Sequence, residues 1–483
     1  MTDSVDYING LLEQSSAPFR CQFSEGRGRF LVMIKEIDTG DILFQGPLLH
    51  KVAEDVRHPV YIELTRLFHF DQSDALDYSP MWYWCALNSL SFKISDFLPC
   101  ITEEQSRQLG MLYHPKQFVP SPTIRRVVGS IRKYLTHDLT ESELMALDEM
   151  TIIWTLNCFE HADDPLTYAS FFLPSFMSHS CGPNAMWATV RDTFSIRAQR
   201  PMKAGDELTV SYLSEEFSLR PIAKRREHLQ STKFFACDCW RCTAELDDTR
   251  GFPIPKRFGT GPECFIRYSK LDKCVYGCGS VVSLSESELE RLISLEADLV
   301  DTVTELDGSD AEDTIPVRPD PKLFSSDEQA NYLSDLVEEM GLFHWATIRG
   351  LYQLSEYYKS IAMYPRAIEM TRKRIEGRQK FVRATNPSMS SGLAWALEEL
   401  GDLLLLHVSG SVVAGLCEEA RERFCETWMP RSQEDFETLK ACGAWEAYND
   451  ALQILTSVFG PDHEHTITAR AKVDALRTKL ELI

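Results

Sequence analysis

Three cysteines lie within six residues of one another, in the segment Cys237-Asp-Cys239-Trp-Arg-Cys242, and this spacing constrains the chain more than any other feature. Thiolates so close together can converge on one tetrahedral Zn²⁺ through short Zn–S bonds. Zinc takes four ligands, and Cys181, in the segment 178–184, is the most attractive fourth donor. The alternative is a set of buried thiols on a tight turn, which is disfavoured because adjacent metal-free thiols would be reactive. The sequence therefore predicts a zinc site built from Cys181, Cys237, Cys239 and Cys242.

Length and charge bound the class of protein. The 483 residues are enough for two to four domains at roughly 100–200 residues per domain. A hydrophobic fraction of 44% is ordinary for globular chains and excludes a disordered or fibrous protein. The formal net charge of −22 argues against direct binding to nucleic acid, because such binding needs cations that neutralise phosphates. It favours basic partners such as Lys-rich protein tails.

The sequence predicts no membrane span, because no run of about 18 or more apolar residues occurs. The N-terminus is acidic and lacks the basic start and apolar stretch of a signal peptide. We therefore expect an intracellular protein, in the nucleus and/or the cytoplasm. In that setting the 14 cysteines should be free thiols or metal ligands rather than disulfides.

Hydrophobic periodicity changes several times along the chain. The first fifty residues are typical of short strands and turns, residues 52–156 of helices, and residues 171–212 of strands again. Residues 296–328 are acidic and contain several prolines, which predicts a linker. The remainder predicts paired amphipathic helices, either tetratricopeptide-like (TPR-like) or a generic helical bundle, since no clean 34-residue repeat aligns.

Four further segments stand in a fixed order before the cysteine cluster. They are Gly26-Arg27-Gly28-Arg29-Phe30, Asn157-Cys158-Phe159, Ser178-His-Ser-Cys-Gly-Pro-Asn184 and Gly205-Asp-Glu-Leu-Thr-Val-Ser-Tyr212. In order and spacing they resemble the motifs of the SET-domain lysine methyltransferases, and specifically of the SMYD type. The resemblance implies an α+β fold: a split SET β-fold with a helical insert, a zinc-binding post-SET segment and an α-helical TPR-like C-terminal domain.

The same resemblance implies domain boundaries. They are 1–50 for the N-terminal SET half, 51–156 for the helical insert, 157–215 for the C-terminal SET half, 216–280 for the post-SET zinc region, 281–330 for a helix and acidic linker, and 331–483 for the TPR-like helical domain.

Enzymes of this family transfer a methyl group from S-adenosylmethionine (SAM) to a lysine amine. The resemblance makes Tyr212 the catalytic tyrosine that orients the methyl group and the amine, and places Phe159 in the wall of the lysine channel. The cofactor-binding residues that it implies are Gly26, Arg27, Gly28, Ser178, His179, Tyr212 and Phe235, with His179 acting mainly through its backbone and Phe235 covering the adenine. Core packing is the alternative role for Phe159 and Phe235.

The cysteines also mark a departure from the family. Residues 45–170 contain only Cys85, Cys100 and Cys158, too few for the MYND zinc finger that the family carries between the SET halves. Cys264, Cys274 and Cys278 could form a second zinc site, but only three ligands are visible and their spacing is loose. Buried thiols are the favoured interpretation there.

Two further departures bear on function. Ser178 stands where the family has an asparagine. A serine hydroxyl cannot reproduce the two hydrogen bonds that an asparagine amide makes. Lys233 stands at the position of the family's second tyrosine, unless the alignment shifts by one residue to Phe234.

The leading hypothesis is a SAM-dependent protein-lysine methyltransferase that acts on an exposed lysine of a histone or non-histone protein, with further protein partners at the TPR-like domain. The alternative is a catalytically impaired SET and TPR-like protein-interaction scaffold.

Overall fold

The computed structural model of the chain describes residues 2–70, 76–161, 164–253, 265–270, 273–276, 281–282, 284–307, 324, 326–384, 390–409 and 433–481. Two compact units can be distinguished. The first comprises residues 1–178 and 187–209, and the second comprises residues 179–186 and 210–483. In the part of the chain that is described, no helix combines the length and apolarity needed to cross a lipid bilayer.

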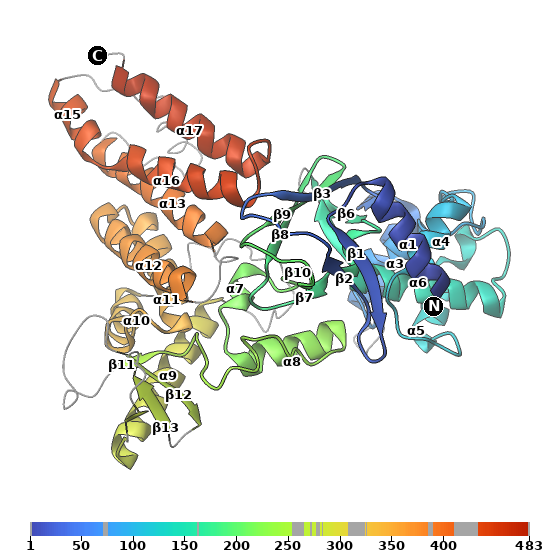
Figure 1. Ribbon diagram of the computed structural model, residues 1–483, viewed down its shortest axis with the longest axis horizontal. Coiled ribbons are helices and arrows are strands. Elements are labelled where there is room, and N and C mark those ends of the chain that lie inside the picture. Colours follow the sequence, from blue (N-terminus) through green and yellow to red (C-terminus); the bar gives the residue numbers. More distant parts are fainter. Residues whose placement is uncertain are drawn as a thin grey trace. The chain divides into compact units, whose positions relative to one another are not determined.

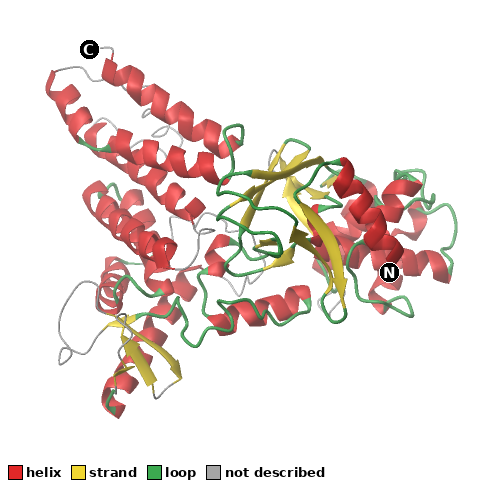
Figure 2. Ribbon diagram, viewed as in Figure 1, coloured by secondary structure: helices red, strands yellow, loops and turns green. Residues whose placement is uncertain are grey.

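The first unit combines short sheets with a group of helices (Figure 2). Its helices are α1 (Thr2–Gln14), α2 (Pro59–Phe70), α3 (Pro80–Leu87), α4 (Glu103–Met111), α5 (Pro122–Ile131), the 3₁₀ turn η1 (Arg132–Tyr134), α6 (Glu141–Asn157) and the 3₁₀ turn η2 (Pro174–Phe176). Its strands are β1 (Phe19–Ser24), β2 (Gly28–Met33), β3 (Ile42–Pro47), β4 (His50–Ala53), β5 (Cys158–His161), β6 (Asp164–Ser170) and β9 (Thr193–Ala198). Three further strands, β7 (Ser178–His179), β8 (Ala185–Val190) and β10 (Thr209–Val210), have residues in both units. The strands pair in the orders β1–β2, β4–β6–β5, β3–β9–β8 and β10–β7.

Helices α2 to α6 occupy the interval between β4 and β5, as the periodicity of residues 52–156 predicts. Capping boxes start two of them: Thr102 with Gln105 at α4, and Thr140 with Glu143 at α6. In each box the threonine hydroxyl accepts the N–H of the third helical residue, which satisfies a backbone donor that the helix itself leaves without a partner.

The expectation of strands and turns throughout the first fifty residues is wrong at its start. Residues Thr2–Gln14 form helix α1, whose Ile8 and Leu12 are buried. These two residues are four apart and therefore lie on one face of a helix. Val5 lies three residues before Ile8 and extends the same face, so the helical spacing is present in the sequence.

The Gly26–Gly28 segment forms the turn between β1 and β2. The two strands pair in register from Phe19 opposite Met33 to Ser24 opposite Gly28. Gly26 and Gly28 have φ angles of 86° and 76°, a region that residues with a Cβ atom enter only at a cost. The glycines are thus required by the turn itself, whatever else they contact.

The second unit begins with the cysteine-bearing segment and continues into helices. Its helices are α7 (Glu215–Ser218), α8 (Ile222–Lys233), α9 (Glu286–Asp307), α10 (Asp327–Met340), α11 (Trp345–Ser360), α12 (Tyr364–Ala384), α13 (Ser390–Ser409), α15 (Gln433–Ala441), α16 (Ala444–Val458) and α17 (Glu464–Glu481). A small antiparallel sheet has the order β11 (Phe252–Pro253), β12 (Phe265–Lys270), β13 (Lys273–Tyr276) and β14 (Val281–Val282). Helices α11, α12, α13, α16 and α17 pack in succession (Figure 1).

The acidic stretch from residue 296 is not a linker at its beginning, because α9 continues to Asp307. Its Leu299, Val303 and Leu306 are buried in the core of the second unit, so apolar contacts hold the acidic segment in a helix. The possible second zinc site is only partly described: Cys264 and Cys278 lie outside the described residues, and of Cys274 only the backbone position in β13 is given.

A nearly buried ion pair joins α7 to the C-terminal helices within the second unit. One carboxylate oxygen of Glu215 accepts a hydrogen bond from Arg378 Nη1 at 2.7 Å, and the other accepts from Ser391 Oγ at 2.7 Å. The side chains of Glu215 and Arg378 are only 11% and 12% exposed. Burial raises the pKa of Glu215, while Arg378 and Ser391 oppose that rise by stabilising the charged form.

Replacing Arg378 by methionine should destabilise the second unit, because it leaves the Glu215 carboxylate buried without its counter-charge. Breaking one side of a buried pair costs about 3–5 kcal/mol. Differential scanning calorimetry of Arg378→Met should therefore show a clearly lowered Tm. The matched control is Lys224→Met, which breaks the exposed pair with Glu227 and should cost about 1 kcal/mol or less. Equal shifts in the two variants would contradict this assignment.

Candidate functional site

The four cysteines that the spacing singles out come together in the second unit. Cys181 follows β7, and Cys237, Cys239 and Cys242 lie in the loop after α8. Their four Sγ atoms all lie within 4.8 Å of one another, with Cys181 Sγ at 4.0 Å from Cys237 Sγ and 3.5 Å from Cys242 Sγ. Tetrahedral zinc with Zn–S bonds of about 2.3 Å needs sulfurs roughly 3.8 Å apart. The residues present therefore fit a Zn²⁺ ion.

Local structure explains why the loop can present three sulfurs. The backbone N–H groups of Cys242 and Thr243 both donate to the carbonyl of Cys239, at 2.9 and 3.0 Å, which closes a tight turn. Helix α8 ends at Lys233, and Phe234 then adopts a left-handed conformation with φ 61°, which turns the chain toward the cysteines. Leu213 and Leu229 are buried against the cluster, and these apolar side chains limit water access to it.

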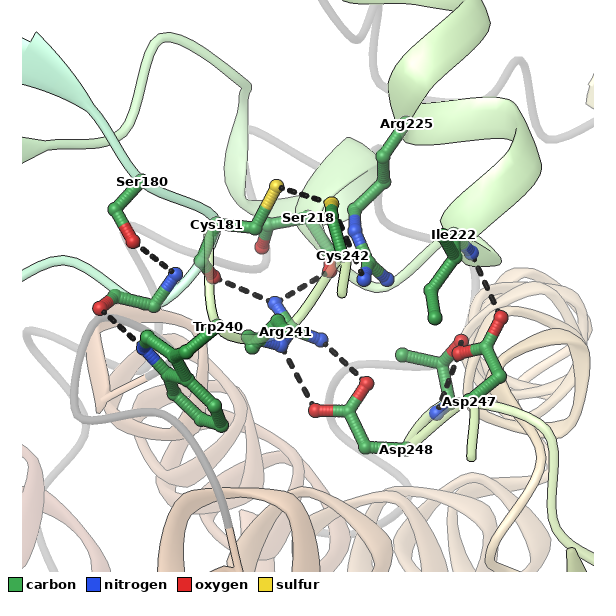
Figure 3. A network of polar contacts seen from close by, with 12 residues as sticks. Ser180, Cys181, Ser218, Ile222, Arg225, Trp240, Arg241, Cys242, Asp247 and Asp248 are labelled. Carbon is green, nitrogen blue, oxygen red and sulfur yellow. Dashed lines mark hydrogen bonds and ion pairs between the residues drawn. The ribbon is translucent and has the colours of Figure 1, made fainter. Parts of the chain in front are cut away.

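Two buried arginines flank the cluster, and the sequence analysis did not identify either (Figure 3). Arg241 pairs with Asp248 at 2.8 and 2.9 Å and donates to the carbonyl of Cys181 at 2.6 Å. Arg225, on α8, donates to the carbonyl of Arg220 at 2.5 Å, and its Nη2 lies 4.0 Å from Cys242 Sγ. Four thiolates outnumber the charges of one Zn²⁺, so a loaded site is an anion that these guanidinium groups can stabilise.

Hydrogen bonds among the sulfurs make the ionised form of Cys239 favourable. Contacts from Cys181, Cys237 and Cys242 hold the pKa of the Cys239 thiol far below its usual range. The same contacts raise the pKa of the Cys181 thiol.

Trp240 closes one side of the loop that carries Cys181. Its indole N–H donates to the carbonyl of Gly182 at 3.1 Å. A Cβ atom at Gly182 would lie 2.4 Å from the Trp240 ring, so only glycine allows this approach. The pairing of Gly182 with Trp240 is a second feature that spacing alone did not reveal.

Three of the residues implied by the family resemblance lie next to one another in the second unit. The ring of His179 has its centroid 5.2 Å from that of Tyr212 and 5.9 Å from that of Phe235. The backbone N–H of Tyr212 donates to His179 Nδ1 at 2.9 Å. Tyr212 remains 40% exposed, and burial lowers the pKa of His179 to about 4, which keeps its ring neutral at pH 7. An accessible phenol therefore stands beside a neutral imidazole.

The other implied residues belong to the first unit and are described there. Arg27 donates from Nη2 to both carboxylate oxygens of Glu207, at 2.7 and 2.8 Å, so its guanidinium is committed to a protein carboxylate. The backbone N–H of Ser178 donates to the carbonyl of Leu208 at 3.4 Å. Gly26 and Gly28 form the turn already described. None of these contacts decides whether the residues bind a cofactor, and that role stays a prediction.

Phe159 lies in an aromatic cluster of the first unit. Its ring centroid is 5.6 Å from Phe171, 5.1 Å from Trp187 and 5.2 Å from Phe194, each in an edge-to-face arrangement. Such rings can line an apolar channel, and they can equally pack a core. Lys233, at the second tyrosine position of the family, is half-buried at the end of α8, whereas Phe234 is 45% exposed.

Comparison with known proteins finds similarity over part of the chain. The SET domain family model matches residues 28–213. A SET and MYND domain-containing protein of Dictyostelium discoideum is 38% identical over 81 residues, which are 16% of this chain and 15% of that protein. N-lysine methyltransferase SMYD2 of Homo sapiens is 30% identical over 139 residues, which are 25% of this chain and 31% of that protein. The matched segments thus span less than a third of these relatives.

A structural comparison adds little. The solved structure of Rubisco LSMT bound to AdoMet aligns over 91% of this chain and 97% of that chain, with 13% identity and a TM-score of 0.27. That score is too low to carry an argument.

Replacing Cys239 by serine should remove the metal and loosen the post-SET loop, because metal binding and local folding are coupled. We expect the purified variant to contain little zinc by atomic emission analysis and to melt at a lower temperature than the wild type. Cys442→Ser, in the same unit but remote in sequence from the cluster, is the matched control and should keep its zinc. Unchanged zinc content in Cys239→Ser would show that the cluster is not a metal site.

Replacing Arg225 by methionine should weaken metal retention without removing a ligand. Loss of a partner of the ligands typically costs about 10–100-fold in metal affinity. Competition with a chromogenic chelator measures that affinity directly. Lys224→Met changes the preceding, exposed residue of α8 and should leave it unaltered. An Arg225→Met protein that holds zinc as tightly as the control would rule out a role for this guanidinium.

Proposed function

Because the chain carries a SET domain and is related to SMYD2 and the SET-MYND proteins, we propose that it is a SAM-dependent protein-lysine N-methyltransferase. The observation that carries the proposal is the placement of Tyr212 beside His179 and Phe235, directly next to the four-cysteine cluster. The SET-domain match covers His179 and Tyr212 and ends one residue after Tyr212. The match also includes Cys181, and the other three cysteines and a region of packed helices follow it along the chain.

The residues proposed to hold the cofactor are Gly26, Arg27, Gly28, Ser178, His179, Tyr212 and Phe235. When bound, SAM supplies an electrophilic methyl group on a sulfonium sulfur. Gly26 and Gly28 have no side chains that would block a close approach to the backbone of this turn, and the Arg27 side chain is directed to Glu207. The ring of Phe235 offers an apolar face on which an adenine can stack.

Tyr212 is proposed to align the reacting groups. Its hydroxyl can accept a hydrogen bond from an attacking amine and direct the amine lone pair along the line of displacement. The amine must be neutral to attack, although an unperturbed lysine has a pKa of about 10.4. Aromatic surroundings such as those of Phe159 disfavour the ammonium form and so lower that pKa.

The cysteine site is proposed to hold zinc in a structural role. All four ligands are protein sulfurs, which leaves no open position for a substrate. Cys181 lies two residues after His179, and Cys237 lies two residues after Phe235. Fixing the four sulfurs therefore restrains the two loops that carry these proposed cofactor-binding residues.

The substrate is proposed to be a protein with an exposed lysine in a basic segment. The net charge of −22 favours association with cationic chains over a range of several ångströms. The C-terminal helices α11 to α17 are proposed to contribute protein-binding surface. The identity of the substrate protein and the number of methyl groups transferred are left open by this proposal.

A binding measurement separates this proposal from the scaffold alternative. Isothermal titration of the purified protein with SAM and with S-adenosylhomocysteine should give saturable one-to-one binding if Ser178 is tolerated at the asparagine position. No binding by folded, zinc-containing protein would favour the scaffold.

Replacing Tyr212 by phenylalanine should leave SAM binding and Tm unchanged and reduce turnover. A positioned hydroxyl contributes roughly 10²-fold to the rate in comparable cases. The measurement is methyl incorporation into a Lys-rich protein from labelled SAM. Tyr332→Phe alters an exposed tyrosine of α10 and serves as the control. Full activity in Tyr212→Phe would exclude the role proposed for this hydroxyl.

A further inference from the structure

The side chain of His179 makes two polar contacts on opposite sides of its ring, both within the second unit. Nδ1 accepts the backbone N–H of Tyr212 at 2.9 Å. Nε2 lies 3.3 Å from the sulfur of Cys181. The family resemblance implies a role for this residue mainly through its backbone, and the proposed cofactor site does not account for these two side-chain contacts.

The first contact determines the tautomer. A ring nitrogen that accepts a backbone N–H carries no proton, so the proton of the neutral imidazole lies on Nε2. The Nε2–H group then donates to Cys181 Sγ. A metal-bound thiolate is an anion and a much better acceptor than a thiol, because the hydrogen bond becomes charge-assisted.

The surroundings leave the ring little freedom to make these bonds in another orientation. The rings of Tyr212 and Phe235 both pack against it, at centroid distances of 5.2 and 5.9 Å. Cys181 is fully buried. The backbone also joins the two segments, since the N–H of Ser180 donates to the carbonyl of Val210 at 2.9 Å. Beyond Val210 the short strand β10 ends, and the Tyr212 N–H is received by a side chain instead of by a neighbouring strand.

We propose that His179 is a positioning residue that transmits occupancy of the cysteine site to Tyr212, through an Nε2–H···S bond to Cys181 and an N–H···Nδ1 bond from Tyr212. This inference rests on the proposed function, since it takes Cys181 as a metal ligand and Tyr212 as the catalytic tyrosine. Metal loading then stabilises the backbone that carries the tyrosine, and loss of metal releases it.

Two amide substitutions separate the two bonds. In His179→Gln the side-chain NH₂ reaches about the position of Nε2 and keeps the donor to sulfur, whereas the acceptor for Tyr212 is lost. In His179→Asn the side-chain oxygen takes about the position of Nδ1 and keeps the acceptor, whereas the donor to sulfur is lost. His179→Phe loses both bonds and keeps an aromatic ring between Tyr212 and Phe235.

Each of the two hydrogen bonds has its own readout, and neither readout depends on methyl transfer. The first is the rate of zinc release to an excess of chelator. The second is amide hydrogen exchange of Tyr212, measured by TROSY spectra of deuterated protein labelled with ¹⁵N-tyrosine. The chain has 16 tyrosines, so such a spectrum is simple, and the signal absent from Tyr212→Phe is that of Tyr212.

The proposal predicts opposite patterns in the two amide variants. His179→Asn should release zinc roughly tenfold faster, as for other partners of metal ligands, with Tyr212 exchange near that of the wild type. His179→Gln should exchange the Tyr212 amide roughly tenfold faster with near-normal zinc release. His179→Phe should show both changes. In the wild type, removal of zinc should accelerate Tyr212 exchange, and in His179→Asn it should have little further effect.

Other outcomes overturn the link. If both readouts change together in both amide variants, or if neither changes, His179 does not transmit metal occupancy. Circular dichroism verifies that each variant is folded. The matched control is His228→Gln. His228 is a half-buried histidine of α8 whose ring contacts that of Phe217, and its replacement should alter neither readout.

The design distinguishes failure of the link from failure of the proposed function. Wild-type protein that binds no zinc would overturn the metal site, and with it this inference. Zinc-loaded protein whose readouts do not separate would overturn the link alone. Absence of methyl transfer to a test protein would count against the proposed activity and would leave both readouts intact.

Discussion

The convergence of four cysteine sulfurs is the constraint on which the local structure around Tyr212 depends. Cys181 Sγ lies 3.5 Å from Cys242 Sγ although 61 residues separate them in sequence. Contacts between the loops that carry these sulfurs help to order them, because the conformational entropy of a loop backbone opposes order. The turn at Cys239, the left-handed Phe234 and the approach of Trp240 to Gly182 are all consistent with one geometry of these sulfurs.

Charge is distributed around this site in an unusual way for an acidic protein. Buried guanidinium groups of Arg225 and Arg241 adjoin the cysteines, and Asp248 balances one of them. Burying a charge is costly unless a counter-charge is present. A site that is anionic when loaded supplies that counter-charge, so the metal and the arginines stabilise each other. The same reasoning explains why Arg225 can lie fully buried on an otherwise polar helix.

Tyr212 lies between two such buried networks in the second unit. On one side, His179 connects its backbone to Cys181. On the other side, Glu215, three residues later, is bound by Arg378 and Ser391 of the C-terminal helices. A residue that remains 40% exposed is therefore held from both directions along the chain. This arrangement suits a side chain that must be accessible to a substrate and fixed in position, since misplacement of a reacting group by about 1 Å can be costly in rate.

The sequence alone predicts the four cysteines that come together, the strand and helix pattern of most of the chain, and the resemblance to SET-domain proteins. Cysteine spacing and the order of the motifs can be read from the sequence, because they depend only on positions along the chain. The expectation of strands and turns misses helix α1, although Val5, Ile8 and Leu12 recur at helical spacing. The expectation of a linker misses the helical start of the acidic stretch, where buried Leu299 and Val303 outweigh the charged residues. Only the tertiary structure decided that Arg225 lies against Cys242, that Trp240 covers Gly182, and that the ring of His179 joins Cys181 to Tyr212. Each of these contacts depends on the direction in which a side chain leaves its backbone and on burial from water, which no spacing in the sequence encodes.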